Sequence, residues 1–236
     1  HPDIVIHCMS GHGGRHAAAY KVTYILTLRH LLGILQPAFC VFTSSTSVYT
    51  QNDGSEVNEE SPAGGTPTAD VLLEAERLSL ARGGSVIRLG GIYGPGRCRF
   101  IQAALADQPP PPESKASFIN LIHRDDAASA LVHAALHRLC GIFNAVDDHP
   151  GRRSAIAEAI RRPVPAAPAN DNAIPATGKR VSNAKLRATG WHPRFPSVAD
   201  AMREDPELRR SCGCTTTSTG PCATRRGFGI ASNKNL

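Results

Sequence analysis

The sequence lacks several patterns that would place it at once in a common class of protein. No apolar run approaches the ~18 residues that a membrane-spanning helix requires, because Thr27, Arg29 and His30 interrupt the longest largely apolar stretch, residues 24–35. We therefore expect no membrane segment. Neither a His-Glu-x-x-His motif nor a Gly-x-Ser-x-Gly turn occurs, so a zinc peptidase or an α/β-hydrolase has no support.

An excess of positive charge is present but is confined to one end. The chain carries 26 Lys and Arg against 20 Asp and Glu, a net charge of +6. Residues 208–236 hold five of the positive side chains and no acidic one, which leaves 21 basic and 20 acidic residues in 1–207. A nearly neutral body argues against a broad phosphate-binding surface, and we expect no nucleic-acid partner.

The cysteines and histidines indicate neither a disulfide framework nor a metal centre. The seven cysteines are scattered and odd in number, a usage that fits a reducing cytoplasm. His7, His12 and His16 have no partner carboxylate at ligand spacing. The Cys-x-Cys at 212–214, with one further cysteine and no nearby histidine, is a weak zinc signal. We predict no metal site.

Apolar periodicity predicts an α/β fold. Short apolar runs that read as buried strands alternate with segments whose apolar residues recur every three or four positions, the pattern of a parallel sheet flanked by helices. The predicted strands are 3–8, 39–43, 85–89 and 142–146, and the predicted helices are 17–35, 69–82, 125–139, 154–161 and a short one at 183–189.

A glycine-rich turn at 11–14 stands where a dinucleotide fingerprint would be expected, between the first strand and a helix. The third glycine of that fingerprint would fall on His16, and the next strand ends in Thr43-Ser44-Ser45 instead of an acidic residue. A flexible turn is therefore a better interpretation than a pyrophosphate cradle.

Two later segments have the composition of ligand-binding loops. Residues 42–49 place a cluster of hydroxyls at the carboxyl end of a buried strand, where open α/β sheets form their ligand crevice. Residues 88–97 are rich in Gly and Pro and end in Arg97, whose guanidinium suits a phosphate. The alternatives are hydroxyls that cap turns and a surface arginine on a tight loop.

In this order, the two segments resemble the NAD(P)-dependent epimerase/dehydratase group of the extended and atypical short-chain dehydrogenases/reductases. Residues 3–8 resemble the fourth strand of that family, 120–128 the start of a later helix, and 141–148 a later strand, so the resemblance covers about residues 2–204. It implies a Rossmann-like parallel sheet, NAD or NADP as the cofactor, and a small-molecule substrate, often a nucleotide sugar.

If residues 3–8 are the fourth strand, the sheet is truncated at its amino terminus and its affinity for NAD or NADP is weak. We expect a partial dinucleotide-binding domain over 1–150, a small substrate-side region over 151–207 and a disordered basic tail over 208–236.

The resemblance also assigns site residues by register. Members of the family usually carry Tyr-x-x-x-Lys, but Thr68 and Leu72 occupy those two positions here. Ser45 is the catalytic residue that remains, and Arg97 and His123 fall on the substrate side. The positions that the resemblance places at the cofactor are Cys8, Met9, Ser10, Thr43, Gly91 and Ile92.

Two functions follow from this pattern. The first is an epimerase/dehydratase-like protein that is catalytically impaired as given. The alternative is a non-catalytic ligand-sensing or interaction protein on the same fold.

Overall fold

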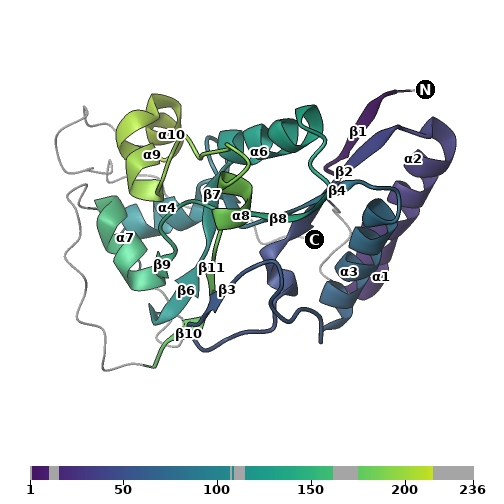
Figure 1. Ribbon diagram of the computed structural model, residues 1–236. Coiled ribbons are helices and arrows are strands. Elements are labelled where there is room, and N and C mark those ends of the chain that lie inside the picture. The colour runs from purple at the N-terminus through teal and green to yellow at the C-terminus, as the bar shows by residue number, and fades with distance from the viewer. Residues whose placement is uncertain (1, 11–15, 107, 109–114, 162–174, 215–236) are drawn as a thin grey trace, which may run out of the picture.

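The computed structural model describes residues 2–10, 16–106, 108, 115–161 and 175–214, and Figure 1 shows their arrangement. The predicted turn at 11–14 lies outside the described residues. The first half of the chain forms β1 (Ile4–His7), α1 (Ala17–Tyr20), η1 (Lys21–Leu26), α2 (Thr27–Leu35), β2 (Phe39–Ser45), η2 (Thr46–Val48), β3 (Glu56–Val57), α3 (Pro67–Leu80), β4 (Ser85–Leu89), β5 (Gly91–Tyr93) and α4 (Arg99–Leu105). The second half forms β6 (Ser117–Ile119), β7 (Leu121–His123), α6 (Arg124–Leu136), β8 (Gly141–Ala145), β9 (Gly151–Arg152), α7 (Arg153–Arg161), β10 (Thr177–Gly178), β11 (Arg180–Val181), α8 (Ala184–Arg187), α9 (Val198–Glu204) and α10 (Pro206–Ser211).

A parallel sheet of four strands, in the order β1-β2-β4-β8, forms the centre of the molecule. This confirms the predicted α/β class and the parallel sheet. Because the strands are parallel, the carboxyl ends of β2 and β4 meet at the same edge, and Ser45 pairs in register with Leu89.

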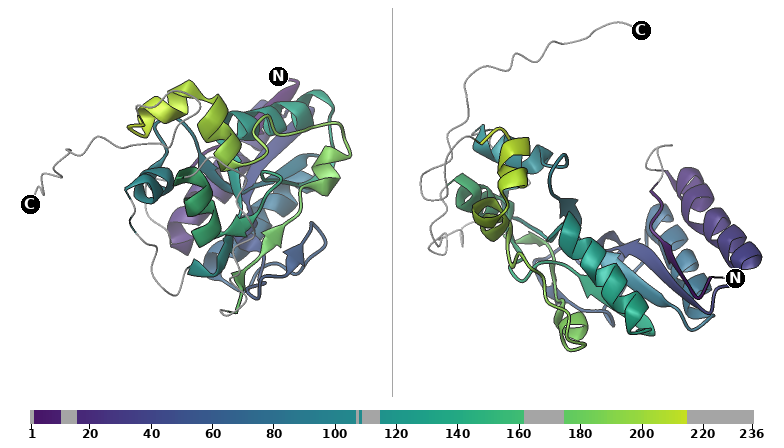
Figure 2. Two further views of the ribbon diagram at one scale, coloured as in Figure 1. Left: turned by 90° about the vertical axis from the view of Figure 1, so that its left-hand side faces the viewer. Right: turned by 90° about the horizontal axis from the view of Figure 1, so that it is seen from above.

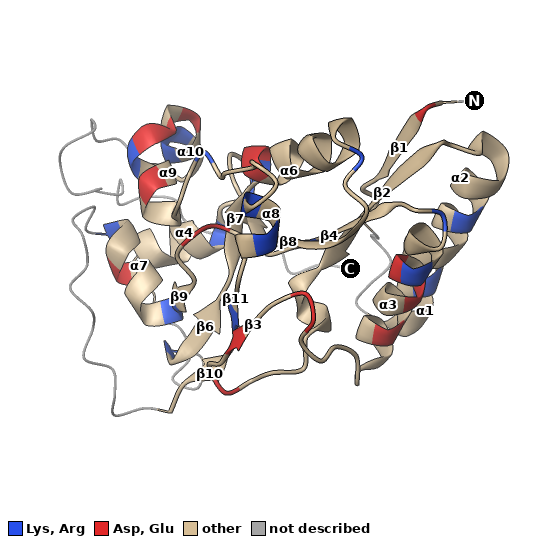
Figure 3. Cartoon of the chain, viewed as in Figure 1, with Lys and Arg blue, Asp and Glu red and all other residues tan. Residues whose placement is uncertain are grey.

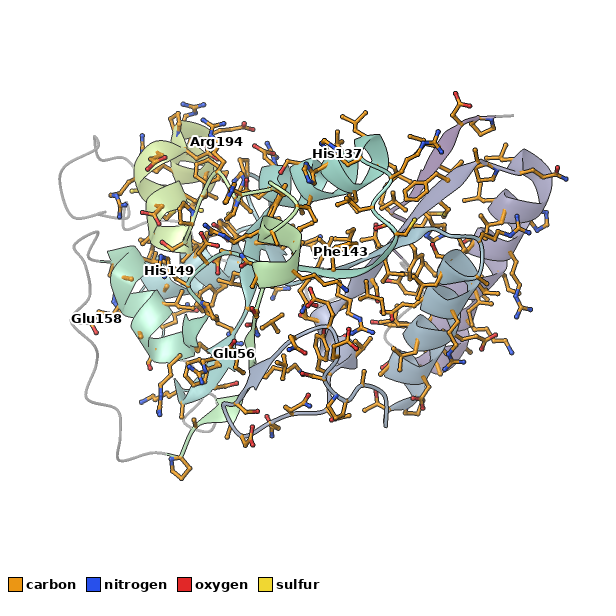
Figure 4. All side chains as sticks on the ribbon, viewed as in Figure 1. Glu56, His137, Phe143, His149, Glu158 and Arg194 are labelled. Carbon is orange, nitrogen blue, oxygen red and sulfur yellow. The ribbon has the colours of Figure 1, made fainter. Side chains whose placement is uncertain are left out.

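Helices cover both faces of this sheet (Figures 1 and 2). On one face, η1, α2 and α3 bury Ile25, Leu28 and Ala75 against Phe42 of β2. On the other face, α6 is lined with small residues such as Ala130, which lets it pack close to the sheet. Figure 4 labels Phe143 of β8, which belongs to this second cluster. Burial on both faces explains why the strands read as continuous apolar runs.

Two glycines make the turn from α3 to β4. Gly83 has a φ of +69°, which a side chain would strain. A Cβ on Gly84 would lie 2.5 Å from the carbonyl oxygen of Cys40. Glycine at 84 therefore lets the turn pack directly against β2, and the predicted end of this helix at the Gly-Gly pair is confirmed.

A third, separate core joins α4 to α7, α9 and α10, which gather beyond the end of the sheet (Figure 1). Ile101 of α4 is buried in it together with Ile160, Phe195 and Leu208. The substrate-side region predicted over 151–207 thus packs with a helix from the first half of the chain.

The prediction of a disordered tail over 208–236 is wrong for its first seven residues, 208–214. Residues 206–211 form α10, and Leu208 and Cys212 are buried against the third core, so 208–214 are ordered. Asp205 starts the helix by accepting from the backbone N–H groups of Glu207 and Leu208, a cap that supplies order without long apolar periodicity. Residues 215–236 lie outside the described residues.

Charged side chains of both signs are interspersed over α3, α9 and α10 (Figure 3). Within the part of the chain that the structure describes, no helix has the length and apolar character needed to cross a bilayer.

Candidate functional site

A cavity of about 810 Å³ opens at the carboxyl ends of the parallel strands. Among the segments that line it are 8–10 after β1, 43–47 from the end of β2 into η2, and 89–92 where β4 passes into β5. This is the crevice in which open α/β sheets bind their ligands.

The hydroxyl segment at the end of β2 lines the cavity in the way the sequence predicts. Ser45 Oγ accepts a hydrogen bond of 3.2 Å from the backbone N–H of Ser47 and so starts η2. That bond leaves the proton of the Ser45 hydroxyl free to be donated. The Oγ1 of Thr43, two residues earlier and on the same side of the strand, is buried and has no hydrogen-bond partner among the described residues.

A buried polar network holds this segment in place. The Glu76 carboxylate accepts from Ser44 Oγ at 2.6 Å and from two nitrogens of Arg88 at 3.0 and 2.7 Å. The Arg88 guanidinium also lies 4.9 Å from the ring centre of Tyr49. The Tyr49 hydroxyl donates to Oδ1 of Asn144 at 2.7 Å. The network thus ties together β2, α3, β4 and β8.

Burial and neighbouring charges shift the pKa values of Arg88 and Tyr49 in this network. Burial alone would lower the pKa of Arg88, but the hydrogen bonds and the charge of Glu76 raise it above its ordinary value. Burial raises the pKa of Tyr49, which keeps its hydroxyl protonated as a donor. A charged pair and a neutral phenol therefore share the space beneath the hydroxyl segment.

The predicted site residues are brought together with one exception. Ser45, Arg97 and all six of the residues predicted to contact the cofactor line the cavity; these six are Cys8, Met9, Ser10, Thr43, Gly91 and Ile92. Their roles in binding and catalysis stay predictions, whereas their placement around one cavity is a finding.

His123 is the exception, because its side chain is fully buried and does not line the cavity. Its Nδ1 accepts from the backbone N–H of Asp125 at 3.2 Å and caps α6. Its Nε2 lies 3.2 Å from Oδ2 of Asp205, and its ring centre is 4.5 Å from that of Phe195. This histidine joins β7 to the third core, and we assign it no contact with substrate.

Burial and hydrogen bonds shift the pKa of three aspartates, Asp126, Asp147 and Asp148. Asp126 accepts from the backbone N–H groups of Arg194, labelled in Figure 4, and Phe195, yet burial raises its pKa. Asp147 is almost completely buried, and burial raises its pKa well above the ordinary value. At Asp148, burial also opposes ionisation, but hydrogen bonds from Arg187 and Asn183 prevail and lower the pKa.

We expect Asp147→Asn to stabilise the fold at neutral pH. The raised pKa means that the folded state binds a proton more tightly than the unfolded state. The contribution of Asp147 to stability is therefore fully present only below its unfolded pKa, and it is lost as pH rises through the folded value. Free energies of unfolding measured in urea between pH 5 and pH 8 should show an advantage of the variant that grows with pH.

Asp148→Asn is the matched control for this measurement. Its lowered pKa gives a contribution that is present above the unfolded pKa and lost on acidification, so this variant should lose stability at neutral pH. An advantage of Asp147→Asn that stays constant over the pH range would contradict our interpretation of Asp147.

Thr68 and Leu72, the two positions that the resemblance assigns to the proton-transfer pair, lie one helical turn apart on α3. Leu72 is buried and lines the cavity. Thr68 is partly buried and stands one helical turn before Leu72, hence on the same face of the helix. Neither side chain provides an acid or a base of useful pKa, so the cavity lacks this pair.

Sequence reasoning missed several cavity residues. Tyr20 and Tyr24, within the helix predicted over 17–35, line the cavity, and so do Arg153 and Lys179, which belong to no motif of the sequence. Apolar periodicity does not distinguish a tyrosine that faces a cavity from one that faces the core. Lys179 follows Ser45 by more than a hundred residues, so only the folded chain reveals that the two line one cavity.

The comparisons with known proteins agree with this geometry. No family model and no curated protein matches the sequence. A solved structure described as an NAD-dependent epimerase/dehydratase from Methylobacillus flagellatus is 29% identical, with a TM-score of 0.68 over 83% of this chain and 72% of that chain.

Two further solved structures contain ligands. RMD from Pseudomonas aeruginosa, complexed with NADPH, is 21% identical, with a TM-score of 0.67 over 89% of this chain and 81% of that one. A single-residue mutant of the UDP-glucuronic acid 4-epimerase of Bacillus cereus, in complex with UDP-4-deoxy-4-fluoro-glucuronic acid and NAD, is 18% identical, with a TM-score of 0.67 over 89% and 75%.

The sheet and its crevice define a Rossmann-like α/β protein. More specifically, this chain has the fold of the NAD(P)-dependent epimerases and dehydratases of the extended short-chain dehydrogenase group.

Proposed function

We propose that this chain is an epimerase/dehydratase-like protein that binds NAD(P) in the cavity together with a nucleotide sugar or a similar alcohol or ketone, and that its catalysis is impaired because Thr68 and Leu72 stand at the positions of the tyrosine and lysine. The observation that carries the proposal is the hydroxyl segment 43–47 lining a cavity at the carboxyl ends of β2 and β4. Five described cysteines are free thiols, which fits the cytoplasmic location that we propose, whereas Cys214 is disulfide-bonded.

The residues around the cavity fit such a cofactor. Buried polar groups almost always have partners, so the unpartnered Oγ1 of Thr43 is a position that a ligand group would satisfy. Met9 is half exposed beside it and offers an apolar surface. Thr43, Met9 and the backbone at Gly91 and Ile92 are the groups that would hold the cofactor.

When bound, NAD(P) supplies the acceptor and donor of a hydride. The residues of the chain bind and orient the substrate. The oxygen of the Ser45 hydroxyl already accepts a hydrogen bond from Ser47, and its O–H group donates a hydrogen bond to the substrate oxygen. Tyr24 lines the same cavity, and burial together with neighbouring Tyr20 raises its pKa, so it is a neutral hydrogen-bond donor and a poor proton acceptor.

Titration with NADH and NADPH by calorimetry tests the cofactor. We expect saturable but weak binding, with a dissociation constant above the micromolar range, because the sequence contains no complete glycine fingerprint to hold the pyrophosphate. Thr43→Val should weaken it about fivefold to tenfold, the equivalent of one hydrogen bond of about 1 kcal/mol.

Thr50→Val is the control, since this exposed hydroxyl bonds to the carbonyl of Pro62 and does not line the cavity. It should leave both affinities unchanged. A wild-type chain that binds neither nucleotide would refute the cofactor proposal.

A second candidate function is a non-catalytic sensor that binds a ligand in the same cavity. The observation that favours it is that Leu72, which has no proton to transfer, lines the cavity one helical turn after Thr68. It predicts that the chain binds a nucleotide sugar and leaves it chemically unchanged over prolonged incubation with cofactor.

A further inference from the structure

Among the described residues, the cavity is lined by four positive side chains and by no carboxylate. One of the four, Arg124, is already neutralised by Asp125 and Glu207. The other three are Arg97, Arg153 and Lys179, and within the described ranges none of them has a carboxylate at salt-bridge distance. An acid-free cavity with three unpaired cations attracts anionic ligands.

Two of these cations are arginines, one just before α4 and one at the start of α7, which packs with α4 in the third core. Arg97 is exposed in the loop before α4, where its Nε donates to the carbonyl of Ile92 at 3.0 Å. Arg153 begins α7, with its guanidinium 5.4 Å from the ring centre of Phe100 and its Nε buried without a partner among the described residues. Guanidinium groups bind phosphates in a forked geometry, so this pair suits the diphosphate of a nucleotide sugar.

Lys179 comes from a different part of the fold. It lies between the short strands β10 and β11, and its Nζ donates to the carbonyl oxygen of Tyr49 at 2.6 Å. Tyr49 follows η2, which itself begins directly after Ser45. The ammonium is therefore held at the hydroxyl segment, where the proposed function places the reacting part of the substrate.

The environment of Lys179 leaves its charge without compensation. Burial lowers the pKa of the ammonium group, and its hydrogen-bond partner is a neutral carbonyl. A partly desolvated cation without a counter-ion is costly. A ligand carboxylate would offset that cost, whereas a neutral hydroxyl in the same place would not.

We propose that Lys179 is a specificity-determining residue that binds a carboxylate on the sugar, so that this chain prefers an acidic nucleotide sugar to a neutral one. This inference rests on the function proposed above. The three cations then have different roles. Arg97 and Arg153 bind the phosphates common to all nucleotide sugars, and Lys179 distinguishes an acidic sugar from a neutral one.

The test compares UDP-glucuronic acid with UDP-glucose, which differ in a carboxylate against a hydroxymethyl group. Calorimetric titration of the wild-type chain should give about tenfold or more tighter binding of the acid, the size expected of one charge-assisted hydrogen bond. Lys179→Met should weaken binding of the acid by that factor and leave UDP-glucose unaffected. Lys179→Arg, which keeps the charge, should retain a preference for the acid.

Lys21→Met is the matched control, because Lys21 is an exposed lysine on η1 that does not line the cavity. It removes the same charge from the protein and should preserve the preference. Thermal unfolding of each variant checks that the fold is intact, and the wild-type comparison of the two ligands needs no variant.

The outcomes separate this inference from the proposed function. Equal wild-type affinity for the two ligands would overturn the role of Lys179 and leave the proposed function standing. Equal weakening of both ligands by Lys179→Met would also overturn it, since the ammonium would then hold the diphosphate or only the loop at Tyr49. Failure of the wild-type chain to bind either ligand would refute the proposed substrate class, and this inference with it.

Discussion

Replacing Glu76 by alanine is expected to lower the free energy of unfolding by about 3–5 kcal/mol. The carboxylate is buried and bonds to Ser44 and to two nitrogens of Arg88. Without it, the Arg88 guanidinium stays buried beside the ring of Tyr49, and its charge loses the carboxylate that neutralises it. Urea unfolding followed by circular dichroism measures the loss.

Glu74→Ala is the control for this experiment, two residues earlier on the same helix. Glu74 pairs with Arg29 at 3.1 Å, but both side chains are largely exposed, at 42% and 56%. Surface pairs contribute about 0–1 kcal/mol, so this variant should be nearly neutral. Similar small losses for Glu74→Ala and Glu76→Ala would show that the buried network does not hold the end of β2.

The double variant Glu76→Ala/Arg88→Met refines the interpretation. It removes the unpaired charge together with its former partner, and should recover part of the stability lost in the single variant. A double variant less stable than Glu76→Ala would mean that packing of the Arg88 side chain, and not its charge, dominates.

Introducing a tyrosine at 68 and a lysine at 72 is expected to have the largest effect on catalysis. In the double variant Thr68→Tyr/Leu72→Lys, the new phenol and ammonium would stand one helical turn apart on α3, whose Leu72 lines the same cavity as Ser45. General acid–base catalysis contributes about 10²–10⁴-fold to turnover. We expect this increase over the wild-type rate with NAD(P) and a nucleotide sugar, measured by cofactor absorbance and by chromatography of the sugar.

Thr68→Phe/Leu72→Met supplies side chains of similar size without the proton-transferring groups, and should stay at the wild-type rate. A wild-type chain that turns substrate over rapidly, with a rate lost on Thr68→Ala, would contradict our view that neither position performs the chemistry. An unchanged rate in the tyrosine–lysine variant, with binding intact, would show that the cavity does not orient substrate for this reaction.

Local sequence patterns predicted the four strands of the central sheet and five helical segments, but not the short strands β3, β5, β6, β7, β9, β10 and β11 or the helices α4, α9 and α10. The strand at 85–89 has the predicted bounds, and the helix predicted over 69–82 spans 67–80. The helix predicted over 17–35 is present as the consecutive segments α1, η1 and α2, with six residues in the π-helical form. Apolar spacing marks the buried face of a helix, but it is too coarse to distinguish its hydrogen-bond pattern.

The candidate site was predictable only in part, and His123 shows why. Its position after a strand and before a helix is the same as that of a ligand-binding residue, so the resemblance assigned it to the substrate. Its side chain is instead enclosed by Tyr93, Phe195 and Asp205, two of which come from the far end of the chain. Which way a side chain turns depends on packing partners that local sequence does not specify.

The amino-acid sequence by itself determined the parallel α/β class, the hydroxyl segment at 42–49 and the absence of a tyrosine and a lysine from 68 and 72. These properties depend on residue type and short-range spacing, which act along a few turns of chain. The tertiary structure alone decided that Lys179 faces the same cavity as Ser45 and that Arg88 is neutralised by Glu76. Such contacts arise only when distant segments pack, because the cost of burying a charge is met by whatever partner the fold brings to it.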